Sequence, residues 1–296
     1  MKTTTAERPS GAAGLACVTS GQALARAVAG FRARGERVAL VPTMGGLHAG
    51  HLSLLDQARR HADRVVVSIY VNPTQFAAGE DFARYPRDLE ADRETLSRAG
   101  ADLLFAPDDA TVYPHGLSAA LCLAAPPALA GTLCGLSRAG HFDGVVSVVA
   151  RLFNLVRPDA AVFGEKDYQQ LLIVEYLARD LGYPIDIVRA PLCRDSDGLA
   201  FSSRNVYLTA AERRAALALP HTLESAARAL TGRRRERLVE CERQGWAALR
   251  AAGLEPEYFT VRDAGDLGPP RPGGSWRILA AARVGRTRLI DNWAVP

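Results

Sequence analysis

The chain has 296 residues, 48% of them hydrophobic and 23% charged, and its formal net charge at pH 7 is +4. These values are typical of a globular protein with one large or two medium domains. The mild charge suits small anionic substrates and does not argue for nucleic acid, so no nucleic-acid partner is expected. No membrane span is expected either, because no apolar run reaches about 18 residues.

The first predicted elements lead into a glycine-containing turn. Residues 1–14 are rich in Thr, Ala, Gly, Pro and Ser, which predicts a disordered extension. Ser20 is a suitable N-cap for a helix that ends near residue 34, and the apolar run 38–41 predicts a buried strand. The stretch 42–51, with the sequence PTMGGLHAGH, predicts a sharp turn and then a helix from about residue 50.

Two histidines stand at the start of that helix. His48 and His51 are three residues apart, so both imidazoles can share one face of the first turn. A helix N-terminus offers unpaired N–H groups and partial positive charge, which favour a bound phosphate and neutral histidines. A capping histidine beside a surface histidine, or a metal-binding pair, would have the same spacing, so the pair alone leaves these alternatives open.

The next segments predict a second strand that ends in polar residues. Residues 64–71 are almost continuously β-branched, which is typical of a parallel strand covered on both faces. Asn72 and Gln75 follow at the strand end where open α/β sheets bind ligands, although Asn-Pro is also an ordinary turn signal. A loop that contains Tyr85 then leads to a helix predicted at 88–99.

Basic residues stand at two further junctions. Arg138 and His141 precede a helix predicted at 145–156, where either an anion site or a plain capping loop would fit. Lys166 lies where a strand predicted at 159–163 meets the next helix. A lysine there can meet a phosphate. It can also be a solvated residue, although the helix dipole disfavours that position.

The alternation of strands and helices over residues 22–190 predicts a doubly wound, Rossmann-like parallel sheet. The nucleotide fingerprints G-x-G-x-x-G and G-x-x-x-x-G-K-[ST] are both absent. The predicted strands lie at 38–41, 64–71, 101–105, 159–163 and 185–190.

The residues after 190 predict a smaller α+β domain. Its first loop contains Ser202, Ser203 and Arg204, whose donors suit triphosphate oxygens, or which form a polar turn. Thr209 and Glu212 form a capping box that opens a helix. A further helix is predicted at 233–252 and strands at 257–262, 276–284 and 287–291. We therefore divide the chain into an extension at 1–14 and domains at 15–190 and 191–296.

Cysteine usage indicates a reducing compartment. The cysteines are odd in number and scattered, and no C-x-x-C occurs, which argues against a disulfide framework and a zinc finger. Together with the lack of an apolar signal-peptide core, this predicts a cytoplasmic location.

Five stretches in order carry a resemblance to a known family. The stretch 42–51 resembles the HIGH-type signature of nucleotidyltransferases and class I aminoacyl-tRNA synthetases, and its fuller form resembles the pantoate–β-alanine ligase (pantothenate synthetase) family. The resemblance covers about residues 20–293. It is carried by residues 41–55, 67–76, 138–144, 163–171 and 197–208, and the closing residues 281–292 are also similar to the end of the family.

The resemblance implies a reaction and a set of ligands. Members of the family join pantoate to β-alanine with ATP and Mg²⁺, pass through a pantoyl adenylate, and release AMP and diphosphate. They have a Rossmann-like domain with a smaller C-terminal lid domain and are usually homodimers. We expect Mg²⁺ to be held mainly by ATP phosphates and assign no metal ligand in the protein.

The resemblance also implies roles for particular residues. The implied ATP-binding residues are Met44, His48, His51, Gly164, Lys166, Asp167, Ser202, Ser203 and Arg204. Among these, His48, His51, Lys166 and Arg204 are the implied catalytic residues that meet phosphates. The residues implied for pantoate, β-alanine or their surroundings are Gln75, Gln170, Asn72, Tyr85, Arg138 and His141.

Two alternatives and three departures from the family pattern accompany this interpretation. A nucleotidyltransferase that acts on a phosphorylated acceptor is the second hypothesis, and an inactive binding or scaffold protein on this fold is the third. Ala139 replaces a usual proline, which removes a restraint on the loop of Arg138. Asp195 stands where glutamate is common, and Phe201 where a smaller or more flexible apolar residue is usual.

Overall fold

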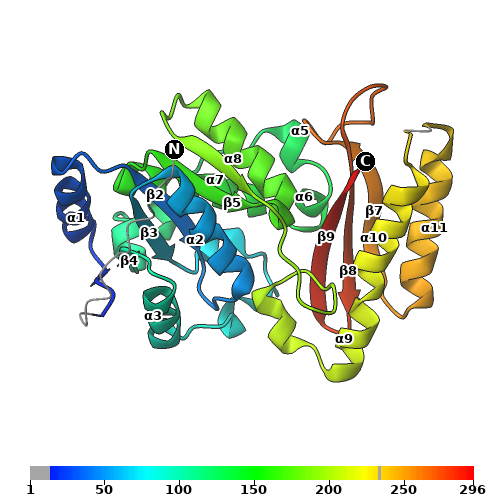
Figure 1. The fold of residues 1–296 in the computed structure, drawn as a ribbon, viewed down its shortest axis with the longest axis horizontal. Coiled ribbons are helices and arrows are strands. Elements are labelled where there is room, and N and C mark those ends of the chain that lie inside the picture. The colour runs from blue at the N-terminus through cyan, green and yellow to red at the C-terminus, as the bar shows by residue number, and fades with distance from the viewer. Residues whose placement is uncertain (1–13, 233–234) are drawn as a thin grey trace, which may run out of the picture.

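The computed structural model describes residues 14–232 and 235–296. The extension predicted at residues 1–14 therefore lies, apart from Gly14, outside the described residues. Two sheets organise the described chain, a six-stranded sheet in the first half and a three-stranded sheet in the second (Figure 1). The strands are β1 Cys17–Val18, β2 Val38–Thr43, β3 Arg64–Ile69, β4 Leu103–Phe105, β5 Ala160–Gly164, β6 Asp186–Ala190, β7 Glu255–Asp263, β8 Trp276–Val284 and β9 Thr287–Val295.

The six-stranded sheet is parallel throughout and has the order β1-β4-β3-β2-β5-β6. The predicted parallel sheet is confirmed, with the five predicted strands as β2 to β6. The two-residue strand β1 was not predicted, because two residues show no periodicity. From β2 the chain moves outward in one direction, and from β5 it moves in the other, so the topological switch point lies between these two strands. Open α/β sheets bind ligands at the carboxyl ends of such a pair.

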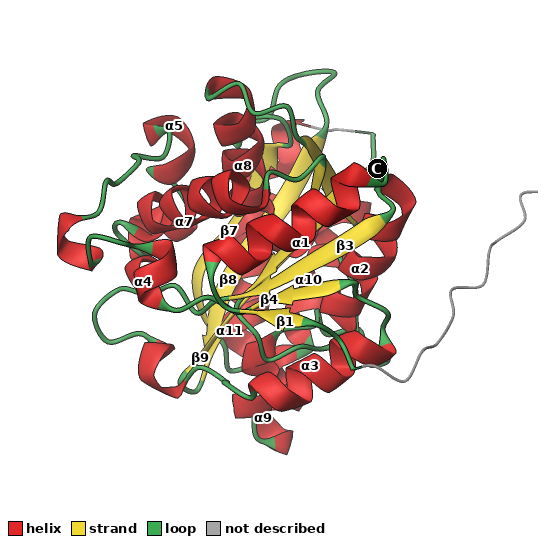
Figure 2. Ribbon diagram, turned by 90° about the vertical axis from the view of Figure 1, so that its left-hand side faces the viewer, coloured by secondary structure: helices red, strands yellow, loops and turns green. Residues whose placement is uncertain are grey.

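Helices cover both faces of this sheet (Figure 2). Val38 and Leu40 pack with α1, α7 and α8, whereas the alternate residues Ala39 and Val41 pack with α2 and α3. Side chains alternate along a strand, so a run that is apolar on both faces contributes to the core on each side of the sheet. The helices are α1 Gly21–Ala33, α2 Ala49–His61, α3 Leu89–Arg98, α4 Asp109–Val112, α5 Pro127–Ala130, α6 Cys134–Ser137, α7 His141–Val156, α8 Tyr168–Asp180, α9 Ala210–Ala216, α10 Ala218–Ala229 and α11 Leu238–Ala251.

One helix begins earlier than the sequence suggests. The prediction that His141 precedes the helix is wrong, because α7 begins at His141 itself. Gly140 adopts a left-handed conformation with φ of 76°, which turns the chain directly into the helix. His141 is therefore held rigidly in the first turn of α7.

The second sheet is antiparallel, with the order β7-β8-β9, and its three predicted strands are confirmed. Helices α10 and α11 pack on its outer face (Figure 1). Leu279 on the opposite face joins the core that includes α7 and α8. The capping box of Thr209 and Glu212 is present at the start of α9. Within the described ranges, every helix is too short or too polar to cross a lipid bilayer.

Candidate active site

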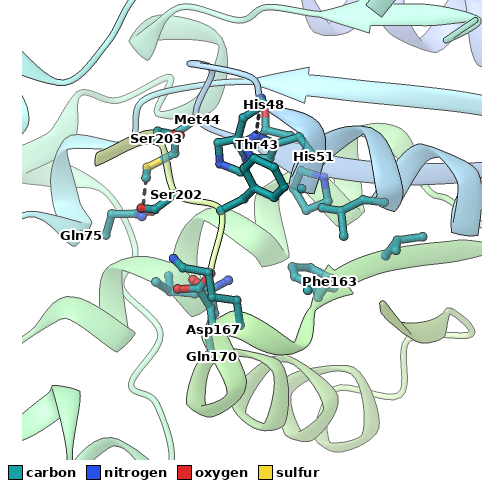
Figure 3. Close-up of a pocket in the computed structure, with 18 of the residues that line it drawn as sticks. Thr43, Met44, His48, His51, Gln75, Phe163, Asp167, Gln170, Ser202 and Ser203 are labelled. Carbon is teal, nitrogen blue, oxygen red and sulfur yellow. Dashed lines mark hydrogen bonds between the residues drawn. The ribbon is translucent and has the colours of Figure 1, made fainter. Parts of the chain in front are cut away.

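A cavity lies at the carboxyl ends of β2 and β5, at the switch point of the parallel sheet (Figure 3). Its lining combines residues from β2, α2, α7, β5 and the segment that follows β6. Almost every residue singled out from the sequence lines it. These residues are Met44, His48, His51, Gln75, Tyr85, Arg138, His141, Gly164, Lys166, Asp167, Gln170, Ser202, Ser203 and Arg204.

The glycine turn after β2 is held from behind by Asp92. Gly45 and Gly46 have φ values of 80° and 62°, a region that favours glycine. The backbone N–H groups of Gly46 and Leu47 donate to the Asp92 carboxylate at 2.9 and 2.8 Å. Asp92 lies on α3 and is 6% exposed. This carboxylate therefore fixes the turn that delivers the histidine pair to the cavity.

The two histidines lie with their rings in contact at the start of α2, tilted by 30° to one another. His48 is the N-cap residue, and its ring centroid lies 4.0 Å from that of His51. The His48 backbone N–H donates to Nδ1 of His51 at 3.3 Å. A neutral His51 that accepts at Nδ1 carries its proton on Nε2. Phe201 stacks on His48, with ring centroids 5.8 Å apart and an interplanar angle of 17°.

Both histidines are neutral near pH 7. Burial, reinforced by the Lys166 charge, lowers the pKa of His48 to about 4. Burial, followed by the effects of His48 and Lys166, lowers the pKa of His51 to about 3. The helix N-terminus suggested neutral histidines from the sequence, but desolvation is the larger cause. A neutral imidazole has one N–H group, which can donate a hydrogen bond to a phosphate oxygen.

Gln75 has its amide fixed on both sides. Its Nε2 donates to the Met44 sulfur at 3.1 Å (Figure 3). Its Oε1 accepts from Asn72 Nδ2 at 3.1 Å. Asn72 does not line the cavity, because the 3₁₀ turn η1 (Pro73–Gln75) turns its side chain inward, where it is 1% exposed. Asn72 therefore supports Gln75 from behind.

Arg138 and His141 form one connected group with Glu80. The Arg138 guanidinium donates to the two Glu80 oxygens at 2.6 and 2.8 Å. Its Nη1 lies 2.9 Å from Nε2 of His141, and Nδ1 of His141 lies 2.7 Å from the backbone oxygen of Gln75. Since Arg138 can only donate, the His141 proton lies on Nδ1 and is donated to Gln75. Burial and the Arg138 charge lower the pKa of His141 to about 4.

Lys166 lines the cavity from the segment that follows β5. It belongs to the 3₁₀ turn η4 (Glu165–Asp167) between β5 and α8, with Asp167 and Gln170 beside it. Among residues 14–232 and 235–296, Lys166 forms no ion pair, so its ammonium has no competing carboxylate partner there. The sequence holds only one other lysine, Lys2, in a chain that otherwise uses arginine.

The loop after β6 closes the cavity from the side of the C-terminal sheet. Ser203 donates to the backbone oxygen of Gly46 at 3.0 Å and so touches the glycine turn. Arg204 pairs with Asp81 and lies over the Tyr85 ring, 5.5 Å from its centroid. Burial raises the pKa of the Tyr85 hydroxyl, so Tyr85 remains a neutral hydrogen-bonding group.

The family model described as "Pantoate-beta-alanine ligase" matches residues 16–294. The chain belongs to the pantoate–β-alanine ligase family. A relative named pantothenate synthetase, from Chromohalobacter salexigens, is 54% identical over 261 residues, which cover 88% of this chain and 91% of that protein. The resemblance predicted from the sequence is confirmed, and it favours a ligase over a nucleotidyltransferase or an inactive scaffold.

Solved structures of the family share the fold. The pantothenate synthetase of Thermus thermophilus has a TM-score of 0.86 and 44% identity and covers 95% of this chain and 99% of that chain. The pantoate–β-alanine ligase of Francisella tularensis, complexed with beta-gamma ATP and beta-alanine, has a TM-score of 0.76 and 30% identity. The match covers 95% of this chain and 97% of that one.

Several groups around the cavity were not found from the sequence. Glu80 and Asp81 stand at the start of the short 3₁₀ turn Asp81–Arg84, and nothing in their spacing relates them to Arg138 or Arg204, which are far away in the chain. Asp92 has a local signal, because it lies four residues before the buried Leu96 and so shares the apolar face of its helix. A carboxylate at such a position predicts a buried acceptor.

Proposed function

We propose that this protein condenses pantoate with β-alanine at the expense of ATP, through a pantoyl adenylate, and releases AMP and diphosphate. The observation that carries the proposal is the joining of a phosphate-binding wall to an amide-lined pocket in one cavity. The histidine pair and Lys166 provide the first, and Gln75 and Gln170 provide the second. The nearly full-length match to the family supports the choice of substrates.

The phosphate-binding wall consists of groups that donate hydrogen bonds or carry fixed positive charge. His48 and His51, both neutral, would donate to phosphate oxygens, and Lys166 would supply a compact positive charge. Ser202, Ser203 and Arg204 would add donors from the loop after β6. Met44, Gly164 and Asp167 would line the remainder of the nucleotide site.

The pantoate pocket would combine amides with apolar side chains. Gln75 and Gln170 offer both donors and acceptors, which suit a substrate with hydroxyl and carboxylate groups. The cavity is also lined by Val149, Leu152 and Phe163, which would contact the methyl groups of pantoate. Arg138, His141, Tyr85 and the supporting Asn72 would shape the neighbouring region that receives β-alanine. A phosphorylated acceptor would need more cations in this part of the cavity.

The proposed chemistry requires positioning and charge stabilisation and uses no protein nucleophile. A pantoate carboxylate oxygen attacks the α-phosphorus of ATP, the bond to the bridging oxygen breaks, and diphosphate leaves. The uncharged amine of β-alanine then attacks the acyl carbon, AMP leaves, and the amine loses a proton. Negative charge grows on phosphate oxygens in the first step, where fixed donors and cations lower the barrier. Exclusion of water protects the acyl adenylate.

The residues present fit a Mg²⁺ ion that arrives with the nucleotide. Within the described residues, no cluster of three His, Cys, Asp or Glu side chains could hold a metal. Mg²⁺ commonly binds phosphates and keeps several waters, so a dedicated protein cage is not required. Asp167 is a carboxylate in the lining that can accept hydrogen bonds from such waters. When bound, the ion would neutralise charge on the phosphates.

The assembly and location of the enzyme form part of the same proposal. We propose a homodimer in the cytoplasm, with residues 15–190 as the ATP- and pantoate-binding domain and residues 191–296 as the lid domain. The free cysteines of the described chain support a reducing compartment. Light scattering coupled to size exclusion would test the dimer.

An AMP-release assay tests the proposal directly. AMP should form when pantoate, β-alanine, ATP and Mg²⁺ are all present. When β-alanine is omitted, pantoate-dependent exchange of diphosphate into ATP should persist, because the adenylate still forms. AMP release that does not require pantoate would refute the proposed reaction. A requirement for a phosphorylated acceptor in place of pantoate would indicate a nucleotidyltransferase.

A further inference from the structure

The C-terminal strand β9 reaches across to the turn that carries Lys166. The side chain of Asn292 is buried, and its Nδ2 donates to the backbone oxygens of Glu165 at 2.9 Å and Lys166 at 3.0 Å. These oxygens belong to consecutive residues of the turn η4. One amide from the second sheet therefore holds two peptide groups of the turn in the first half of the chain.

The orientation of the Asn292 amide is determined by its neighbours. Arg277 donates from Nη1 to Asn292 Oδ1 at 2.6 Å, and its Nη2 lies 3.4 Å from the Glu165 carboxylate. An amide carries its acceptor on one side and its donors on the other. With a guanidinium on one side and two carbonyls on the other, only one orientation satisfies all of them. Arg277 also lies over the Tyr168 ring, 3.8 Å from its centroid, so the supporting group is itself packed.

The neighbouring residue holds a second part of the cavity wall. Asp291 forms an ion pair with Arg194, at 2.7 and 2.9 Å, at the start of the loop that leads to Ser202. Side chains alternate along a strand, so Asp291 and Asn292 point to opposite faces of the sheet. Two consecutive residues of β9 thus brace the two segments that carry the proposed phosphate-binding groups.

Lys166 depends on such support more than a paired side chain would. Its ammonium ends a flexible four-carbon stem, and within the described residues it forms no ion pair that would direct it. The position of the ammonium is therefore set largely by the backbone from which the stem begins. A small rotation of η4 would therefore displace the charge, and a displacement of about 1 Å is enough to impair catalysis.

We propose that Asn292 is a positioning residue that fixes the η4 turn, so that Lys166 meets the phosphate at which adenylate forms. This inference rests on the proposed role of Lys166 in ATP chemistry. Its mechanical consequence is that the C-terminal sheet and the Lys166 turn form one body. A lid movement that separated β9 from η4 would also misplace the lysine.

The kinetic test uses Asn292→Ala in the full-length enzyme. We expect kcat for pantoate-dependent exchange of diphosphate into ATP to fall about 10-fold to 100-fold, because a displacement near 1 Å can cost that much. The KM for β-alanine should stay within about twofold. In a double-mutant cycle with Lys166→Ala, the loss should not be additive, so Asn292→Ala should cost at most about twofold in that background. Full additivity would overturn the proposal.

A spectroscopic test exploits the scarcity of lysine. Protein labelled with carbon-13 at the lysine ε-carbon contains only Lys2 and Lys166 as labelled residues, and Lys166→Arg identifies the second signal. We expect Asn292→Ala to shift or broaden the Lys166 signal. Thr260→Val is the matched control, because it removes a 2.7 Å bond from β7 of the same sheet to Glu242 on α11 without touching η4. An unchanged Lys166 signal in Asn292→Ala would overturn the proposal.

A second variant covers the case in which Asn292→Ala does not fold. Asn292→Asp keeps the volume and an oxygen for Arg277 but replaces the donor group that holds the two carbonyls, so it should show the same kinetic loss and signal change. If the wild-type enzyme shows no pantoate-dependent exchange, the proposed function fails. The Lys166 signal still decides in that case whether Asn292 holds the turn.

Discussion

The Arg204 guanidinium forms a two-point ion pair with the Asp81 carboxylate, with Nε–Oδ2 at 2.8 Å and Nη2–Oδ1 at 2.9 Å. Arg204 lines the cavity from the loop after β6, and Asp81 begins the 3₁₀ turn Asp81–Arg84, so the pair fastens that loop to a turn between β3 and α3. Burial opposes the charge on Asp81, but the bond to Arg204 and its charge outweigh burial and lower the Asp81 pKa. The resemblance implies that Arg204 meets phosphates, and here a carboxylate already occupies two of its donors.

We predict that Asp81 orients Arg204 for the nucleotide. Asp81→Asn places an amide N–H₂ against one guanidinium donor, which costs about 2 kcal/mol of interaction and lets Arg204 turn away. The KM for ATP should rise about 10-fold, with a smaller change in kcat. Initial rates over a range of ATP concentrations measure this.

Glu224→Gln, which breaks an exposed pair with Arg228 on α10, is the control and should leave the KM for ATP unchanged. A lower KM for ATP in Asp81→Asn would mean that Asp81 competes with the nucleotide.

A second prediction concerns the carboxylate behind the glycine turn. Asp92→Asn keeps the side-chain volume, but its amide has only one oxygen to accept from the two backbone N–H groups of Gly46 and Leu47. A donor that remains unpaired in a buried place costs about 1–3 kcal/mol, which corresponds to a loss of about 10-fold to 100-fold in kcat/KM if the turn shifts. Steady-state kinetics and circular dichroism of the same preparation measure activity and fold together.

The control for that substitution lies on the same helix. Asp88 caps the start of α3 by accepting from the Ala91 N–H and lies at the surface, so Asp88→Ala removes the cap and should lower stability by about 1 kcal/mol while it spares catalysis. Equal losses of activity in both variants would show that α3 as a whole, and not the Asp92 carboxylate, supports the site.

Most of the fold could be predicted because its signals are local. The apolar runs in β2 and β3 and the periodicity of the flanking helices are visible within about ten residues of sequence. Residues 106–140 contain the short helices α4 to α6, each of four residues, which have no recognisable periodicity. Their positions depend on contacts with distant segments, such as the Gln169 amide that bonds the backbone of Leu129 and Thr132.

The residues of the candidate site could likewise be predicted only where their sequence signals are local. His48 and Lys166 could be singled out because each follows a predicted strand, and strands of one parallel sheet end at one edge. Asn72 also follows a strand, but sequence alone does not show on which side of a turn a side chain lies. Glu80 and Asn292 act through partners 58 and 127 residues away, and no local pattern encodes such pairs.

A third prediction concerns the dependence of stability on pH. The folded pKa of His141 is about 4, well below its ordinary value of 6.5. Above pH 6.5 the residue is neutral in both states and its contribution is constant. Between pH 6.5 and 4 the unfolded chain binds a proton that the folded chain does not, so the free energy of unfolding falls by up to about 1.4 kcal/mol per pH unit for this group. His48 and His51 act in the same direction.

Urea denaturation at a series of pH values measures this slope. His141→Gln should lower stability at pH 7, because the bond network with Arg138 is disturbed, and should also flatten the decline between pH 6.5 and 4. His115 is exposed, and His115→Gln serves as the control, with no change of slope expected. If His141→Gln keeps the wild-type slope, proton uptake at His141 does not contribute to the acid lability of the fold.

The last prediction concerns the chemical identity of the cation that lines the cavity. Lys166 and Lys2 are the only lysines in a chain that otherwise uses arginine, so a compact ammonium stands where arginine would be the usual choice of this sequence. A guanidinium is wider and planar and directs its donors as a fork. We therefore expect Lys166→Arg to lose nearly as much activity as Lys166→Ala, about 100-fold to 1,000-fold in kcat for adenylate formation, while the fold is kept.

His48→Ala should likewise abolish most adenylate formation. Single-turnover release of diphosphate measures the step, with the exposed exchange Arg214→Lys on α9 as a neutral control. If Lys166→Arg turns over at a rate close to wild type, any positive charge suffices at this position. If Lys166→Ala does so, the lysine has no part in the reaction.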